Sequence, residues 1–61
     1  MLKFRLENGE VVESPAQSYT VEVWYNGQWN IRKVFSPDRW EDVLAFKAQI
    51  KDEDVRVQQW F

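Results

Sequence analysis

The chain lacks the residues on which most active sites and metal centres depend. Among its 61 residues there is no cysteine and no histidine. These absences exclude disulfides, thiol nucleophiles and Cys/His zinc centres, and they remove the most common general base. The few aliphatic hydroxyl side chains are three serines and one threonine, none in a nucleophile-elbow or Ser-x-x-Lys setting. We therefore expect a protein that is not an enzyme and that holds no cofactor and no metal.

Glycine and long apolar runs are also scarce. Both glycines, Gly9 and Gly27, follow an asparagine and are typical of turns, so no glycine-rich loop is available to bind phosphate. No apolar run approaches the roughly 20 residues that a membrane span needs. Residues 1–4 already alternate as a strand does, unlike a signal peptide. We expect a soluble, cytoplasmic protein with no membrane partner.

Charge of one sign is not abundant either. The formal net charge of −2 gives the chain no general attraction to nucleic acid or to anionic membranes. The acidic run at residues 52–54 lacks the ligand spacing of a calcium loop, which indicates a solvated turn. An acidic surface that imitates a phosphate backbone is an open alternative. Its residues are Asp38, Glu41, Asp42, Asp52, Glu53 and Asp54.

Aromatic residues are plentiful. Four tryptophans, four phenylalanines and two tyrosines make up 16% of the chain. A chain of this size buries only about 60% of the surface that its unfolded form exposes, so its core depends on large side chains. We expect residues 1–61 to form a single domain with mostly buried rings.

The first of two asparagine-glycine turns predicts a hairpin with a three-residue loop at residues 7–9. This loop pairs Phe4 with Val12 and places Lys3 opposite Glu13. A two-residue loop would instead place Phe4 opposite Glu13 and set two glutamates against each other, which is unfavourable.

The second turn, at residues 25–27, predicts another hairpin. A three-residue loop pairs Val21 with Ile31 and Val23 with Trp29, and it sorts apolar from polar residues better than a two-residue loop does. In that register Lys33 points inward and Val34 outward. We therefore expect a bulge near the end of this strand that corrects both.

A single helix follows the hairpins. We expect Ser36 as its N-cap, Pro37 at its first helical position and Phe35 packed against Trp40, with the helix ending by residue 50 or 51. One helical face carries the apolar residues Trp40, Val43, Leu44, Phe46 and Ile50. Residues 55–61 alternate again as a strand.

These patterns predict an α+β fold with the element order β-β-β-β-α-β. We expect a five-stranded antiparallel sheet, with strand order 4-3-2-1-5 and the single helix packed on one face. A curled, barrel-like sheet is the alternative.

The predicted outer face of the sheet is the candidate site. It exposes two tryptophans among arginines, and both residue types are enriched at protein interfaces. The candidate partner-binding residues are Arg5, Trp24, Arg32, Arg56 and Trp60. An ordinary solvated sheet face is the alternative interpretation.

This face favours a small non-catalytic protein-binding module that acts by occupying a partner's surface, as an inhibitor or accessory subunit. In size and composition, though in no specific motif, the chain is similar to small acidic phage proteins such as anti-CRISPR proteins. The likeness implies a phage-encoded inhibitor. The alternative is a single-stranded nucleic-acid-binding module that stacks bases on Trp24 and Trp60. A third possibility is a homodimer that completes an undersized core.

Overall fold

The computed structural model describes residues 1–14, 17–51 and 53–61. The loop residues Pro15 and Ala16, and Asp52 of the proposed acidic surface, lie outside the described residues. The elements in chain order are β1 (Leu2–Arg5), β2 (Val11–Ser14), β3 (Ser18–Tyr25), β4 (Gln28–Phe35), α1 (Trp40–Gln49) and β5 (Val55–Trp60). The predicted element order and the α+β class are confirmed. No described helix is long and apolar enough to cross a membrane.

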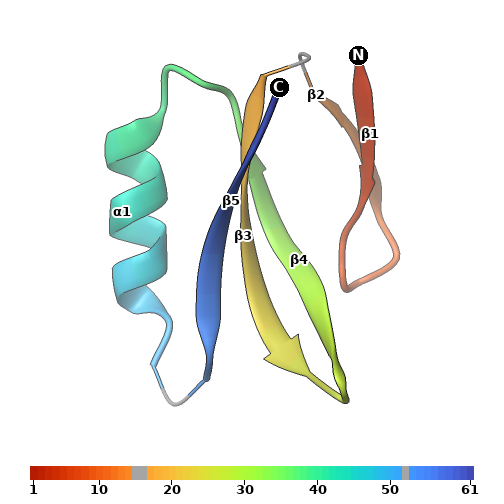
Figure 1. Cartoon of the computed structure of the whole chain (residues 1–61), viewed down its shortest axis with the longest axis vertical. Helices are drawn as coiled ribbons and strands as arrows, with labels where there is room; N and C mark the ends of the chain where they lie inside the picture. Colours follow the sequence, from red (N-terminus) through yellow and green to blue (C-terminus); the bar gives the residue numbers. More distant parts are fainter. Residues whose placement is uncertain (15–16, 52) are drawn as a thin grey trace.

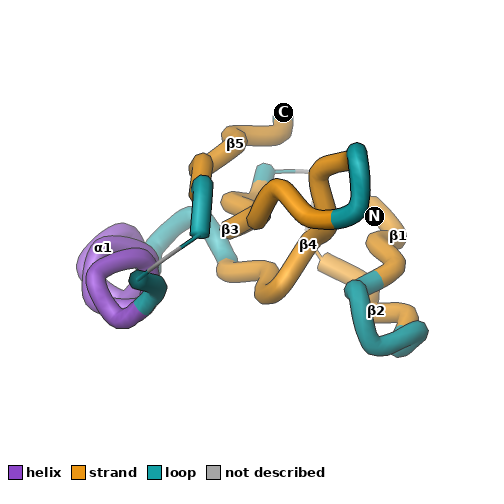
Figure 2. The backbone as a smooth tube through the Cα atoms, turned by 90° about the horizontal axis from the view of Figure 1, so that it is seen from below, coloured by secondary structure: helices purple, strands orange, loops and turns teal. Residues whose placement is uncertain are grey.

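The strands form two antiparallel sheets, so the predicted single five-stranded sheet is wrong (Figure 1). One sheet holds β1 and β2, and the other has the order β4-β3-β5. The last strand pairs with β3 and not with β1, because β3 is eight residues long and rich in β-branched side chains, whereas β1 and β2 have only four residues each. Figure 2 shows α1 and the β1–β2 hairpin on opposite sides of the three-stranded sheet.

The hairpin of β1 and β2 has the predicted register. Phe4 pairs with Val12, and Lys3 lies opposite Glu13. The turn closes with a hydrogen bond from the Gly9 N–H to the Leu6 carbonyl, and Gly9 has a φ of 90°. A residue with a side chain adopts this left-handed conformation only at a cost, which explains the glycine.

The hairpin of β3 and β4 has a different register from the one predicted. Tyr25 pairs with Gln28 across a two-residue loop, in which Asn26 and Gly27 have φ angles of 56° and 81°. Positive φ at both positions is the type I′ turn, whose twist matches that of the strands. Local turn geometry therefore decides the register, ahead of the sorting of apolar from polar residues.

The expected bulge is present in β4. The register shifts between Val21, which pairs with Lys33, and Glu22, which pairs with Ile31, so Arg32 is the extra residue. The bulge does not turn Lys33 outward as predicted. Lys33 stays on the helix side of the sheet, and its ammonium group lies 5.5 Å from the centre of the Phe35 ring.

The core lies between α1 and one face of the β4-β3-β5 sheet. Val21 and Val23 of β3 and Val43 of α1 have no exposed surface. Aromatic pairs flank them, with ring centres 5.1 Å apart for Tyr19 and Trp40, and 5.7 Å apart for Phe35 and Phe46.

The helix begins three residues later than the sequence predicts. Ser36 does not cap it; its hydroxyl donates a hydrogen bond of 2.7 Å to Asp38, which lowers the pKa of that carboxyl below its ordinary value. The Arg39 N–H bonds to the Ser36 carbonyl and closes a turn ahead of Trp40. The helix buries less of its apolar face than predicted, because only Val43 is fully buried and Leu44 is 47% exposed.

Candidate functional site

Three of the five predicted site residues lie on one face of the β4-β3-β5 sheet. This face is the one opposite α1. Trp24 belongs to β3, and Arg56 and Trp60 belong to β5. The pairing of Glu22 with Arg56 and of Ser18 with Trp60 puts these β5 side chains on the face that carries Trp24. Arg5 on β1 and Arg32 at the bulge of β4 lie apart from this group.

A second tryptophan joins Trp24 at the turn end of the sheet. Trp29 lies directly opposite Trp24, and the two rings meet edge to face with their centres 5.4 Å apart. The guanidinium carbon of Arg56 lies 4.4 Å from the centre of the Trp29 ring, a cation–π contact. We call Trp24, Trp29 and Arg56 the aromatic stack. Trp24 is 46% exposed, so the stack faces solvent.

A buried carboxylate holds the arginine of this stack in place. Glu22 is only 4% exposed, and its Oε1 accepts hydrogen bonds from Arg56 Nη2 at 2.9 Å and Nε at 3.2 Å. The Thr20 hydroxyl donates to the other carboxylate oxygen at 2.7 Å and accepts from the Trp60 indole N–H at 3.0 Å. A continuous network therefore runs from Trp60 to Arg56 and fixes the side chains along this face.

Trp60 is packed more tightly than the sequence suggested. Its ring meets the buried Phe4 of β1 edge to face, with centres 5.4 Å apart. This contact seats the β1–β2 hairpin against the sheet. Trp60 thus supports the site from its far end, and Trp24 is the more exposed of the two predicted tryptophans.

Arg32 is bound within the molecule. Its guanidinium donates to Glu7 Oε1 at 2.9 Å and to Glu53 Oε2 at 2.8 Å. The hydrogen bond to Glu53, followed by the one to Glu7, raises the pKa of Arg32 further above its ordinary value. Two carboxylates neutralise this arginine and leave little of its charge for a partner.

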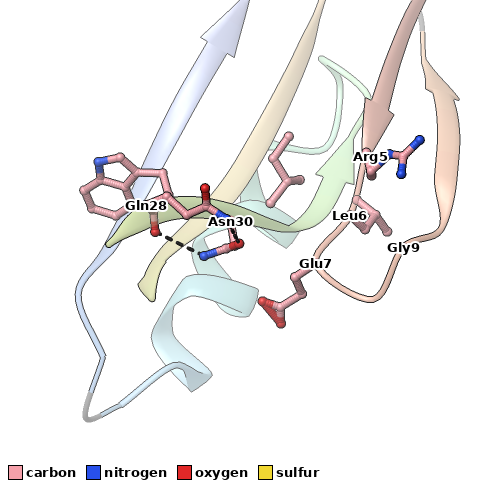
Figure 3. Close-up of a pocket in the computed structure, with 8 residues that line it drawn as sticks. Arg5, Leu6, Glu7, Gly9, Gln28 and Asn30 are labelled. Carbon is pink, nitrogen blue, oxygen red and sulfur yellow. Dashed lines mark hydrogen bonds between the residues drawn. The ribbon is translucent and has the colours of Figure 1, made fainter. Parts of the chain in front are cut away.

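Arg5 lines a shallow groove between the β1–β2 hairpin and the start of β4. Figure 3 shows Arg5 and Glu7 on the hairpin side of this groove and Gln28 and Asn30 on the β4 side. The groove has a volume of about 370 Å³, and Trp29 also lines it. The groove therefore adjoins the aromatic stack.

Sequence reasoning missed Trp29 and Glu22. The three-residue loop placed Trp29 in the core, although the alternative two-residue loop would have placed it beside Trp24. An acidic residue in an alternating strand is typical of a solvated face, so nothing in the sequence marked Glu22 as buried.

No group of three or more acidic side chains within the described ranges is placed to hold a metal ion. The chain matches no protein-family model, no curated protein and no solved structure. The candidate site consists of an exposed aromatic surface with a fixed guanidinium, on a network that holds both in place.

Proposed function

We propose that this protein is a small non-catalytic protein-binding module that acts by covering a partner's surface, as an inhibitor or an accessory subunit. The observation that carries the proposal is the aromatic stack, in which Trp24 is 46% exposed and packs against Trp29. Tryptophan and arginine dominate the binding energy of protein interfaces. Because the Glu22 network already fixes Arg56, little side-chain freedom is lost when a partner binds.

A protein partner fits the charges on this face and beside it better than a nucleic acid does. Arg56 is paired with Glu22, and Arg32 is paired with Glu7 and Glu53. A phosphate backbone would have to compete with these carboxylates for both arginines, and it would be repelled by them. A protein surface can instead pack on the rings and accept hydrogen bonds from the outer guanidinium N–H groups.

The test is affinity capture from a lysate of the native host, treated with nuclease and read by mass spectrometry. The unmodified chain is compared with Trp24→Ala. We expect a stoichiometric protein partner to survive nuclease treatment, and we expect its affinity for Trp24→Ala to fall by about tenfold or more, the loss typical of a tryptophan at the centre of an interface.

Tyr25→Ala is the matched control. Tyr25 follows Trp24 in β3 and is more exposed than Trp24, but its side chain points to the opposite face of the sheet. It should bind the partner as the unmodified chain does. Equal binding by Trp24→Ala would refute the assignment of the surface, and capture that vanishes with nuclease would favour the nucleic-acid alternative.

A further inference from the structure

No described strand lies beside the outer edge of β5. Among the described strands β5 pairs only with β3, whose other edge is occupied by β4. The outer edge of β4 is met by the first hairpin, through a hydrogen bond of 2.9 Å from the Glu7 N–H to the Ile31 carbonyl. The two edges of the sheet therefore differ, and within the described ranges only the β5 edge is open along its length.

The hydrogen-bond alternation shows which groups point outward from this edge. The Trp24 N–H bonds to the Asp54 carbonyl at 2.9 Å, which makes these two residues a hydrogen-bonded pair. In an antiparallel ladder such pairs alternate with pairs whose main-chain groups point away from each other. The N–H and C=O groups of Val55, Val57 and Gln59 therefore face away from β3.

In the part of the chain that the structure describes, this edge carries no proline, lysine or bulge that would hinder strand pairing. Natural edge strands are blocked by proline, lysine, bulges or covering elements. The six residues of β5 include no proline and no lysine, and its pairing with β3 is free of register shifts. The one charged side chain, Arg56, is bound to Glu22 on the face opposite α1.

A hollow flanks this edge on its helix side. Tyr19, Trp40, Val57 and Gln59 line a space of about 350 Å³. Figure 1 shows α1 running alongside β5, and Trp40 at the start of this helix is 45% exposed. A strand added to β5 would direct every second side chain toward this space.

We infer that the β5 edge binds an extended segment of a partner protein, which adds to the sheet as a fourth strand and places an apolar side chain against Trp40. An extended segment supplies main-chain donors and acceptors at the two-residue spacing that Val55, Val57 and Gln59 present. A helix, whose main-chain groups are already paired, cannot do so.

The charges near the hollow specify the segment further. Trp40 also lines a second hollow with Asp38, Arg39, Glu41 and Asp42. Three carboxylates there outnumber the single guanidinium. The segment that fits is extended, with one bulky apolar residue followed or preceded by a basic residue.

This edge is separate from the aromatic stack. The side chains of Val55, Val57 and Gln59 lie on the helix side of the sheet, and Trp24 and Trp29 lie on the other side. Binding of a segment at the β5 edge therefore does not depend on whether the aromatic stack binds a partner.

The experiment selects displayed random 12-residue peptides on the intact chain and measures the affinity of the best synthetic peptide by calorimetry. We expect the selected peptides to share the apolar-basic pattern. Amide exchange should slow at Val57 and Gln59 when the peptide is bound, because their outward N–H groups become hydrogen bonded.

Gln59→Pro removes one outward N–H and leaves the ladder to β3 intact, since proline is tolerated at such edge positions. We expect it to weaken peptide binding by about tenfold. Gln59→Thr keeps the N–H and should bind within about twofold of the unmodified chain. Trp40→Ala, whose side chain is half exposed, tests the hollow independently and should also lose about tenfold.

Several outcomes would overturn the inference. One is unchanged binding by a Gln59→Pro chain whose circular dichroism shows it to be folded. Another is peptide-induced exchange protection at Ile31 and not at β5. The third is a dimer in sedimentation that Gln59→Pro dissociates, because the edge would then belong to a second copy.

Discussion

The carboxylate of Glu22 organises the sheet face that carries the aromatic stack. It is buried, yet its oxygens accept hydrogen bonds from Arg56 and Thr20, and no buried polar side-chain atom lacks a partner among the described residues. Its partner Arg56 keeps 42% of its side chain exposed. The pair thus joins a buried acceptor to a solvent-facing cation, an arrangement that presents a guanidinium in a fixed position.

Replacing Glu22 with glutamine should destabilise the fold. The amide removes the negative charge and turns one acceptor into a donor that faces either Arg56 or the Thr20 hydroxyl. We expect the free energy of unfolding to fall by about 1–3 kcal/mol, the range for hydrogen bonds to charged groups. Urea denaturation measures the change.

The matched control is Glu13→Gln on the exposed surface. Glu13 lies 3.7 Å from Lys3, and both side chains are more than half exposed. Such pairs contribute little, so this change should stay within about 0.5 kcal/mol. A Glu22→Gln chain as stable as the Glu13→Gln chain would show that the buried network does not support the sheet.

At the scale of elements, each strand and the helix could be located from hydrophobic periodicity, but the partner of β5 and the register of the second hairpin could not. The register of the first hairpin was predictable because a wrong loop would set Glu7 against Glu10. No such conflict marks the second hairpin. There the type I′ preference of Asn26-Gly27 favours a register that sorts apolar from polar side chains less well. The bulge at Arg32 then shifts the register for the rest of β4.

The same pairing explains how much of the site was predictable. Strand alternation alone puts Trp24, Arg56 and Trp60 on one face, as expected. Trp29 lies on the same face only because the second hairpin has a two-residue loop, which pairs Trp29 with Trp24. Arg32 does not join this group because it binds Glu7 and Glu53, which lie 25 and 21 residues away in the chain. No local sequence pattern reveals such distant partners.

The turn of the second hairpin provides a test of this register. Gly27 has a φ of 81°, so Gly27→Ala should lower the free energy of unfolding by about 1–2 kcal/mol through backbone strain, although no atom lies within 4 Å of the added methyl group. Asn26→Gly relieves the positive φ at its own position and should cost less.

Nuclear Overhauser effects check the register directly. Non-hydrogen-bonded antiparallel pairs bring their Cα atoms to about 4.5 Å, so a strong Hα–Hα signal is expected between Trp24 and Trp29. A strong signal between Val23 and Trp29 instead would contradict the two-residue loop.

At the scale of the whole molecule, Arg32 joins three segments that are distant in the sequence. Its two ion pairs link the turn of the first hairpin, the bulge of β4 and the segment that follows α1. The adjacent bond from the Glu7 N–H to the Ile31 carbonyl is the main-chain link between the two sheets at the same place. This junction and the contact of Phe4 with Trp60 both join the hairpin, and with it the Arg5 groove, to the larger sheet.

Arg32→Met should therefore loosen the hairpin and leave the β3 ladder intact. We expect a loss of about 1 kcal/mol in the free energy of unfolding at low salt, because three partly exposed charged groups form one network. The loss should shrink near 1 M salt, where the screening length is about 3 Å. Urea denaturation at both salt concentrations, together with amide exchange at Glu7, measures the effect.

Arg39→Met, which removes an exposed pair with Asp42, is the control and should change stability by less than about 0.5 kcal/mol. Equal losses for the two variants, or an unchanged exchange rate at Glu7, would show that the hairpin is held in place without the ion pairs of Arg32.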